Sequence, residues 1–129
     1  MARRKYGNVQ TEYNGRVYTS KLEADTAQRL DLLLCAADDA ERVAEWTAEP
    51  ARCRYRYGVL DKWPHYTFDF RVRWVKATAH HAEEELWECK GAWSQRDRQR
   101  LNFCRDWHVR NGTPLVVRVV YKDREEVLR

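Results

Sequence analysis

The sequence predicts one domain of the α/β or α+β class, in which a mixed β-sheet is flanked by helices. The chain has 129 residues, and 43% of them are hydrophobic, which suits one compact domain with its own core. Segment 65–75 alternates strictly between apolar and polar residues, the period of a strand with one core face. The helix-like segment 94–112 joins two strand-like segments, as in a parallel crossover unit.

The other elements follow in order along the chain. Asn14-Gly15 marks a turn, and Ser20 can cap a helix whose apolar residues recur at helical spacing. Residues 76–85 read as a polar connector with His80 and His81 at its solvated tip. We expect a strand at 16–19, a helix at 20–43, strands near 55–57 and at 65–75 and 86–91, a helix at 94–111 and a central strand at 114–122.

Composition and charge limit the class of protein. Residues 1–15 are expected to form a polar, basic arm, and the net charge of +4 with a pI near 9.0 is compatible with a polyanionic partner. No segment resembles a signal peptide or a membrane span, so we expect a soluble, intracellular protein with no membrane partner. None of the cysteines has CxxC spacing, and we expect all to be free, small hydrophobic residues: Cys35, Cys53, Cys89 and Cys104.

Two strand-like segments carry charged residues among apolar ones, which is costly unless the charges have a role. Glu88 and Lys90 project from one face of their strand, and Asp69 lies on the polar face of the preceding strand. If these strands pair as a hairpin, Asp69 and Glu88 converge, and two adjacent carboxylates favour a cation between them. Mg²⁺ or Mn²⁺ would accept such oxygen ligands, and a nearby lysine could orient water or stabilise charge. This chemistry suits phosphodiester hydrolysis.

The same spacing also fits two half-buried strands without a site. Asp69 could pair with Arg71 or Arg73, and Glu88 with Lys90 could be a surface ion pair. The residue pattern alone leaves both interpretations open.

The order of "FDF" (68–70), "ECK" (88–90) and a basic helix resembles the PD-(D/E)XK nuclease superfamily. The opening "KYGNVQTEYNGRVYTSKLEAD" (5–25), followed by a leucine-rich helix, resembles a phage-encoded, Holliday-junction-resolvase-like endonuclease family of that superfamily. The layout is also similar to the N-terminal domain of the transposon endonuclease TnsA. The resemblance covers roughly residues 5–120 and implies a single nuclease domain with a restriction-endonuclease-like core.

The resemblance implies roles for four residues. Asp69 and Glu88 match the metal-binding acids, Lys90 matches the catalytic lysine, and Glu23 matches an acid of the first helix that helps to bind or position the metal. The implied cofactor is Mg²⁺ or Mn²⁺, with no nucleotide cofactor. Two positions depart from the pattern: Glu49 stands where the family often has glutamine, and Phe68 where the superfamily name has proline.

Glu23 has a second interpretation from its own spacing. Ser20 and Glu23 fit a capping box, in which the glutamate bonds back to the start of the helix. The helical stripe that Glu23 shares with Ala27 and Leu30 nevertheless turns it toward the core, which favours a site.

The helix after Lys90 is rich in arginine. Because it begins where the Lys90 strand ends, its first turn should lie near the site, where phosphates of DNA could be contacted. The alternative is a solvated face paired with Asp97 and Asp106. The candidate DNA-binding residues are Gln95, Arg96, Arg98 and Arg100.

The resemblance implies a metal-dependent DNA endonuclease in the bacterial cytoplasm, if phage-encoded, with branched DNA such as a Holliday junction as a candidate substrate. Its products would carry a 5′-phosphate and a 3′-hydroxyl. Junction resolution needs two cuts and so implies a homodimer. The alternative is an inactive DNA-binding or assembly subunit with the same fold, but such relatives tend to lose an acid or the lysine, and here all are present.

Overall fold

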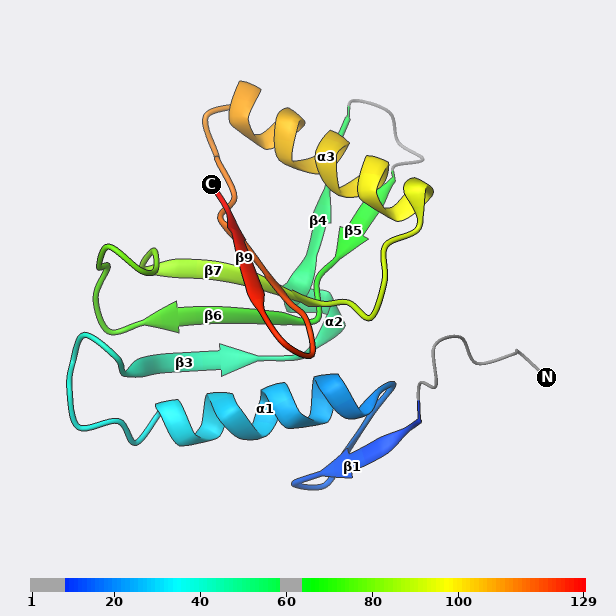
Figure 1. Cartoon of the computed structure of the whole chain (residues 1–129). Helices are drawn as coiled ribbons and strands as arrows, with labels where there is room; N and C mark the ends of the chain where they lie inside the picture. Colours follow the sequence, from blue (N-terminus) through cyan, green and yellow to red (C-terminus); the bar gives the residue numbers. More distant parts are fainter. Residues whose placement is uncertain (1–8, 59–63) are drawn as a thin grey trace.

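The computed structural model describes residues 9–58 and 64–129, and it centres on a five-stranded mixed sheet (Figure 1). The strand order is β3-β6-β7-β8-β9. β6 pairs antiparallel with both β3 and β7, β7 pairs parallel with β8, and β8 pairs antiparallel with β9. The strands span Val43–Thr47, Phe70–Trp74, Glu84–Cys89, Val117–Val120 and Glu125–Leu128. The predicted mixed sheet with helices is therefore confirmed, including the parallel pairing of β7 and β8.

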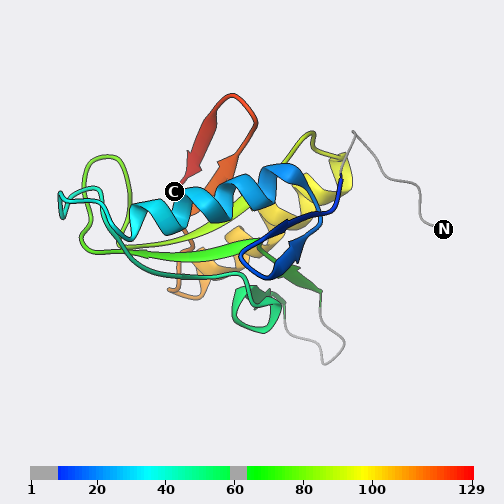
Figure 2. The ribbon, with the colours of Figure 1, turned by 90° about the horizontal axis from the view of Figure 1, so that it is seen from below.

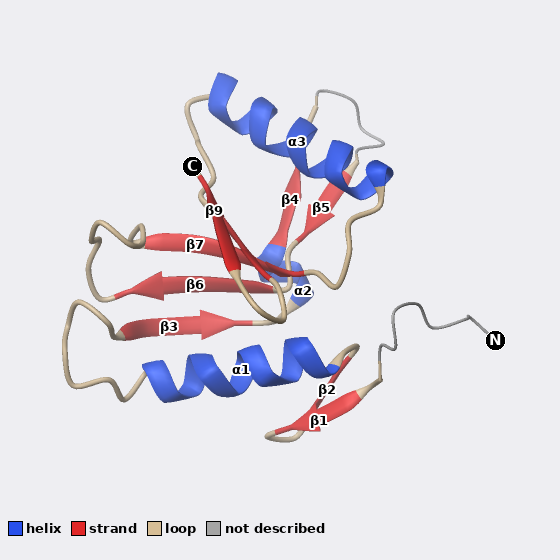
Figure 3. Ribbon diagram, in the orientation of Figure 1, coloured by secondary structure: helices blue, strands red, loops and turns tan. Residues whose placement is uncertain are grey.

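Three helices and two small hairpins complete this part of the chain (Figure 3). One hairpin turns at Asn14 and Gly15, whose φ angles of 50° and 82° suit a tight hairpin turn. The helices are α1 (Lys21–Leu33), α2 (Pro50–Cys53) and α3 (Gln95–Arg110); the hairpins are β1 (Thr11–Tyr13) with β2 (Arg16–Tyr18) and β4 (Arg54–Arg56) with β5 (His65–Thr67).

The helix starts follow the sequence, but one helix end does not. The Ser20 hydroxyl accepts the Glu23 backbone N–H at 3.1 Å, and Ser94 caps α3 in the same way through Asp97. The expectation that the first helix extends to residue 43 is wrong, because α1 ends at Leu33. Asp38 accepts the Ala40 N–H and forms a turn there, after which the chain enters β3.

Segment 65–75 is two strands and not one, since the chain bends at Phe68 and Asp69. The expected alternation of buried and less buried residues is present. However, Tyr66 and Phe68 pack with α3, whereas Phe70 and the later apolar residues of β6 pack with α1. The prediction of a single core face is therefore wrong. The bend places Asp69 between the two clusters.

The two clusters place one helix on each side of the sheet. α1 contributes Ala27 and Leu30 to the first cluster, and α3 contributes Leu101 and Cys104 to the second. Seen from below, α1 lies in front of the sheet and α3 behind it (Figure 2). Each face of the sheet thus packs against one helix, which leaves the strand ends near Asp69 open to a cleft.

Three further expectations can be compared with this fold. Residues 11–13 of the expected N-terminal arm form β1, and the Tyr13 hydroxyl donates to Asp31 at 2.7 Å; the basic residues 2–5 lie outside the described residues. All four cysteines are free, as expected, and burial raises the pKa of Cys53 and Cys104 to about 11. Within residues 9–58 and 64–129, no helix has the length and apolar character needed to cross a membrane.

Candidate active site

The hairpin register brings Asp69 to the end of β7. Phe70 pairs with Trp87, so the residue before Phe70 reaches Glu88. Two hydrogen bonds hold Asp69 there: its N–H donates to the Trp87 carbonyl at 3.0 Å, and its Oδ2 accepts the Cys89 N–H at 2.7 Å. The predicted hairpin, and with it the convergence of Asp69 and Glu88, is confirmed.

All four residues singled out for catalysis line one cleft of about 690 Å³. One wall is the first half of α1, which contributes Glu23. The other walls are the ends of β7 and β8 and the segments that follow them. The sequence-predicted residues in the lining are Glu23, Asp69, Glu88 and Lys90.

Asp69 and Glu88 are two adjacent acids that have no ion-pair partner among the described residues. Burial, followed by the charge of Glu88 and a hydrogen bond to it, holds the pKa of Asp69 well above its usual range. Burial also raises the pKa of Glu88, which is only 5% exposed, against the hydrogen bonds it accepts from Asp69 and Tyr66. Neither carboxylate forms an ion pair with another described residue. The raised pKa values mean that the pair gives up its protons less readily than ordinary carboxyl groups do, and a cation bound there would favour the ionised forms.

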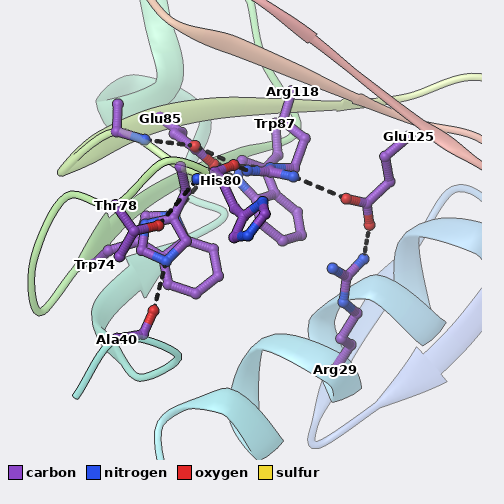
Figure 4. Close-up of polar contacts among 11 residues, drawn as sticks. Arg29, Ala40, Trp74, Thr78, His80, Glu85, Trp87, Arg118 and Glu125 are labelled. Carbon is purple, nitrogen blue, oxygen red and sulfur yellow. Dashed lines mark hydrogen bonds and ion pairs between the residues drawn. The ribbon is translucent and has the colours of Figure 1, made fainter. Parts of the chain in front are cut away.

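Another buried acid of the same strand shows how this fold neutralises a carboxylate. Glu85 is 0% exposed and accepts hydrogen bonds from Arg118, Trp74 and Trp87. Burial alone would raise the pKa of Glu85, but its hydrogen bonds with Arg118 and the charge of that residue prevail, and the pKa is lowered. Figure 4 shows this network continuing from Arg118 through Glu125 to Arg29 on α1. No arginine or lysine of the described residues forms an ion pair with Glu88.

Lys90 does not pair with Glu88, so the interpretation of these residues as a surface ion pair is wrong. Its Nζ lies 3.4 Å from the Asp97 carboxylate and 4.9 Å from the centre of the Trp93 ring. The Lys90 charge still acts to lower the pKa of both Asp69 and Glu88, although burial outweighs it. Lys90 is thus held beside the acid pair without neutralising it.

Glu23 shows one half of the predicted capping box, and its role in a site stays a prediction. Its backbone N–H is capped by Ser20, while its carboxylate lines the cleft and accepts the Thr19 hydroxyl at 2.6 Å. Burial, followed by the charge of Asp69, raises its pKa. By contrast, Glu49 is exposed at the start of α2 and does not line this cleft.

The arginines of α3 have different environments, which the sequence did not indicate. Arg100 donates to the His65 carbonyl at 2.7 Å and lies over the Tyr66 ring, so it ties α3 to β5. Arg98 lies over Trp93, with Glu126 at 3.8 Å. Gln95 and Arg96 are exposed, and the Arg96 side chain makes no hydrogen bond or ion pair with another residue of the described ranges. Contacts of these residues with DNA remain a prediction.

The acid pair fits a hard divalent cation. Among the residues that the structure describes, no group of three or more His, Cys, Asp or Glu side chains is arranged to hold a metal ion. Glu23 is therefore not a third direct ligand beside Asp69 and Glu88 in this geometry. Mg²⁺ commonly binds through one or two carboxylates and keeps several waters, so two acids suffice for it.

No protein-family model, curated protein or solved structure matches this chain. The described residues themselves define a class of site. Two buried carboxylates without a cation, a lysine and a further glutamate meet at the open end of a covered sheet.

Proposed function

We propose that this protein is a divalent-metal-dependent endonuclease that hydrolyses DNA, with an active site of the PD-(D/E)XK type. The observation that supports this most directly is the buried pair Asp69 and Glu88, which faces a cleft beside Lys90 and lacks a cation among the described residues. The antiparallel β6–β7 pair next to the parallel β7–β8 pair is compatible with a restriction-endonuclease-like core.

Asp69 and Glu88 would hold Mg²⁺ or Mn²⁺, with water in the remaining positions. Bound there, the ion would polarise a phosphoryl oxygen and lower the pKa of a water molecule. Asp69 is positioned for this by the Cys89 N–H. Glu23 would not bind the ion directly. It would hold a water molecule of the ion or help to orient Asp69 and Glu88.

The reaction itself needs a water, a leaving oxygen and a place for negative charge. The water oxygen forms a bond to phosphorus while the bond from phosphorus to O3′ breaks, and O3′ ends as a hydroxyl with a proton. Lys90 can orient the attacking water or stabilise the charge that develops on the phosphoryl oxygens. Asp97 and Trp93 hold the Lys90 ammonium near that position.

Cleavage of a panel of labelled DNAs tests the proposal. Duplex, single-stranded, flap and four-way-junction DNA are incubated with the protein in Mg²⁺, Mn²⁺ or EDTA, with Glu88→Gln as the matched variant. We expect cuts with 5′-phosphate and 3′-hydroxyl ends in Mg²⁺ or Mn²⁺, and none in EDTA or with the variant. Binding without cleavage would indicate the non-catalytic subunit. If the protein neither binds nor cleaves any of these DNAs, a role on DNA is refuted.

A further inference from the structure

The cleft contains a second set of charged groups, which the sequence did not single out. Lys21 is the first residue of α1, and Lys122 lies in the turn between β8 and β9. Both are exposed, and both line the cleft that contains Asp69 and Glu88. One lysine therefore comes from the helix wall and the other from the strand-end wall.

These two lysines differ from the other cations of the cleft. Arg29 is paired with Glu125 and lies over the Trp87 ring at 5.1 Å, while Lys90 is paired with Asp97. Within the described ranges, neither Lys21 nor Lys122 has a side-chain hydrogen bond or ion pair. Asp25, one helical turn after Lys21, forms no ion pair with it either. Two cations in the cleft are thus available to a ligand.

The positions of both lysines are set by well-connected backbone. The start of α1 is fixed by the Ser20 cap. The β8–β9 turn is closed by a hydrogen bond from the Tyr121 N–H to the Arg124 carbonyl at 2.8 Å. The Tyr121 hydroxyl also accepts the Trp93 indole N–H at 2.8 Å, which ties this turn to the segment after β7. Figure 2 shows the β8–β9 hairpin projecting from the sheet, and Lys122 belongs to the turn of this hairpin.

The two lysines can offset the negative charge of the cleft toward DNA. The cleft is lined by four acids, Glu23, Asp25, Asp69 and Glu88. Apart from the two lysines, its cations are Arg29 and Lys90, and both are paired with acids outside the lining. A divalent ion at the acid pair would neutralise only part of this charge. A DNA strand carries a negative charge at every phosphate, so it would be repelled on either side of the reacting one. Cations on both walls remove that repulsion.

We propose that Lys21 and Lys122 form a two-sided phosphate clamp, which holds the DNA backbone across the cleft with the reacting phosphate over Asp69 and Glu88. This inference rests on the proposed nuclease function and names the residues that position its substrate. The clamp contacts phosphates and not base edges, so it binds all sequences alike. In this proposal, α1 and the β8–β9 turn provide the phosphate contacts on either side of Asp69 and Glu88.

The test is binding of labelled duplex and four-way-junction DNA in Ca²⁺ over a series of salt concentrations. The double variant Lys21→Gln/Lys122→Gln should bind more weakly, and the slope of log affinity against log salt should become shallower by about 0.9 for each lost duplex contact. The double variant Lys21→Arg/Lys122→Arg should keep the wild-type slope. Both lysines are exposed, so thermal unfolding should be unchanged in each variant.

The matched control removes the same charge outside the cleft. Lys76 and Arg110 are exposed and do not line it, so Lys76→Gln/Arg110→Gln should retain the wild-type slope apart from a small general effect of net charge. If the wild type binds and cuts DNA but the clamp variant behaves like this control, the clamp is refuted and the nuclease stands. If the wild type binds no DNA, the proposed function falls and the clamp with it.

Discussion

Glu85 and Glu88 lie three residues apart on β7 and both are buried, yet within the described part of the chain only Glu85 forms an ion pair with a cation. Arg118 approaches Glu85 at 2.8 Å, and the pKa of Glu85 is lowered, whereas the pKa of Glu88 is raised by burial. A fold that satisfies one buried carboxylate and leaves its neighbour beside a second acid has a reason to do so, because an unpaired buried charge is costly. The divalent cation that we propose at Glu88 and Asp69 would supply that reason.

Neutralising these two glutamates should have opposite effects on stability in EDTA. Glu85→Gln removes the fully buried acid partner of Arg118, which then keeps only its pairing with Glu125, and should lower the free energy of unfolding by about 3 kcal/mol. Glu88→Gln removes a charge from the acid pair and should leave that free energy unchanged or raise it. Urea unfolding of both variants at neutral pH measures the difference. Equal losses would mean that Glu88 is as well neutralised as Glu85.

Asp69→Asn should separate metal binding from folding. The asparagine oxygen can still accept the Cys89 N–H, so the backbone at the bend is retained. Added Mn²⁺ should raise the thermal midpoint of the wild type, since a ligand that binds only the native state stabilises it. The variant should show no such shift, and without metal it should be at least as stable as the wild type. An identical Mn²⁺ shift in the variant would move the metal away from Asp69.

Metal affinity should rise with pH. The folded-state pKa values of Asp69 and Glu88 are raised, so the stability that their shared proton contributes is fully present below the ordinary carboxyl range near pH 4 and is lost as the pH rises through the raised values. A divalent ion binds the ionised carboxylates, so at a pH where the pair is still partly protonated its binding should release protons. Calorimetric titration with Mn²⁺ in buffers of different ionisation enthalpy measures both effects. A constant affinity with no proton release would contradict the assignment.

The sequence predicted the acid pair because strand geometry fixes it. Glu88 and Lys90 must share a face, and a hairpin between neighbouring strands must bring Asp69 close. The parallel β7–β8 pairing follows equally from the helix that connects them. These inferences need only local spacing and one rule of chain connection.

The remaining features depend on partners distant in sequence. β9 was not expected, because its acidic residues do not suggest a strand; Glu125 is held there by Arg118 and Arg29. Glu85 appeared to belong to a polar connector, and its burial depends on that same arginine, a neighbour only across the β7–β8 pair. The prediction that His81 is a solvated tip is wrong, because its ring is buried and stacked on Trp74 at 3.8 Å.

Single-turnover cleavage by Lys90→Ala, together with DNA binding in Ca²⁺, tests the central claim most directly. Lys90 stands beside the acid pair, so its ammonium should act mainly in the transition state, and its removal should lower kcat while leaving affinity nearly intact. We expect a loss on the order of 10²–10³ in rate, with no rescue by Lys90→Arg. Cleavage by Lys90→Ala at the wild-type rate would contradict the account, because Lys90 would then serve only as the ion-pair partner of Asp97.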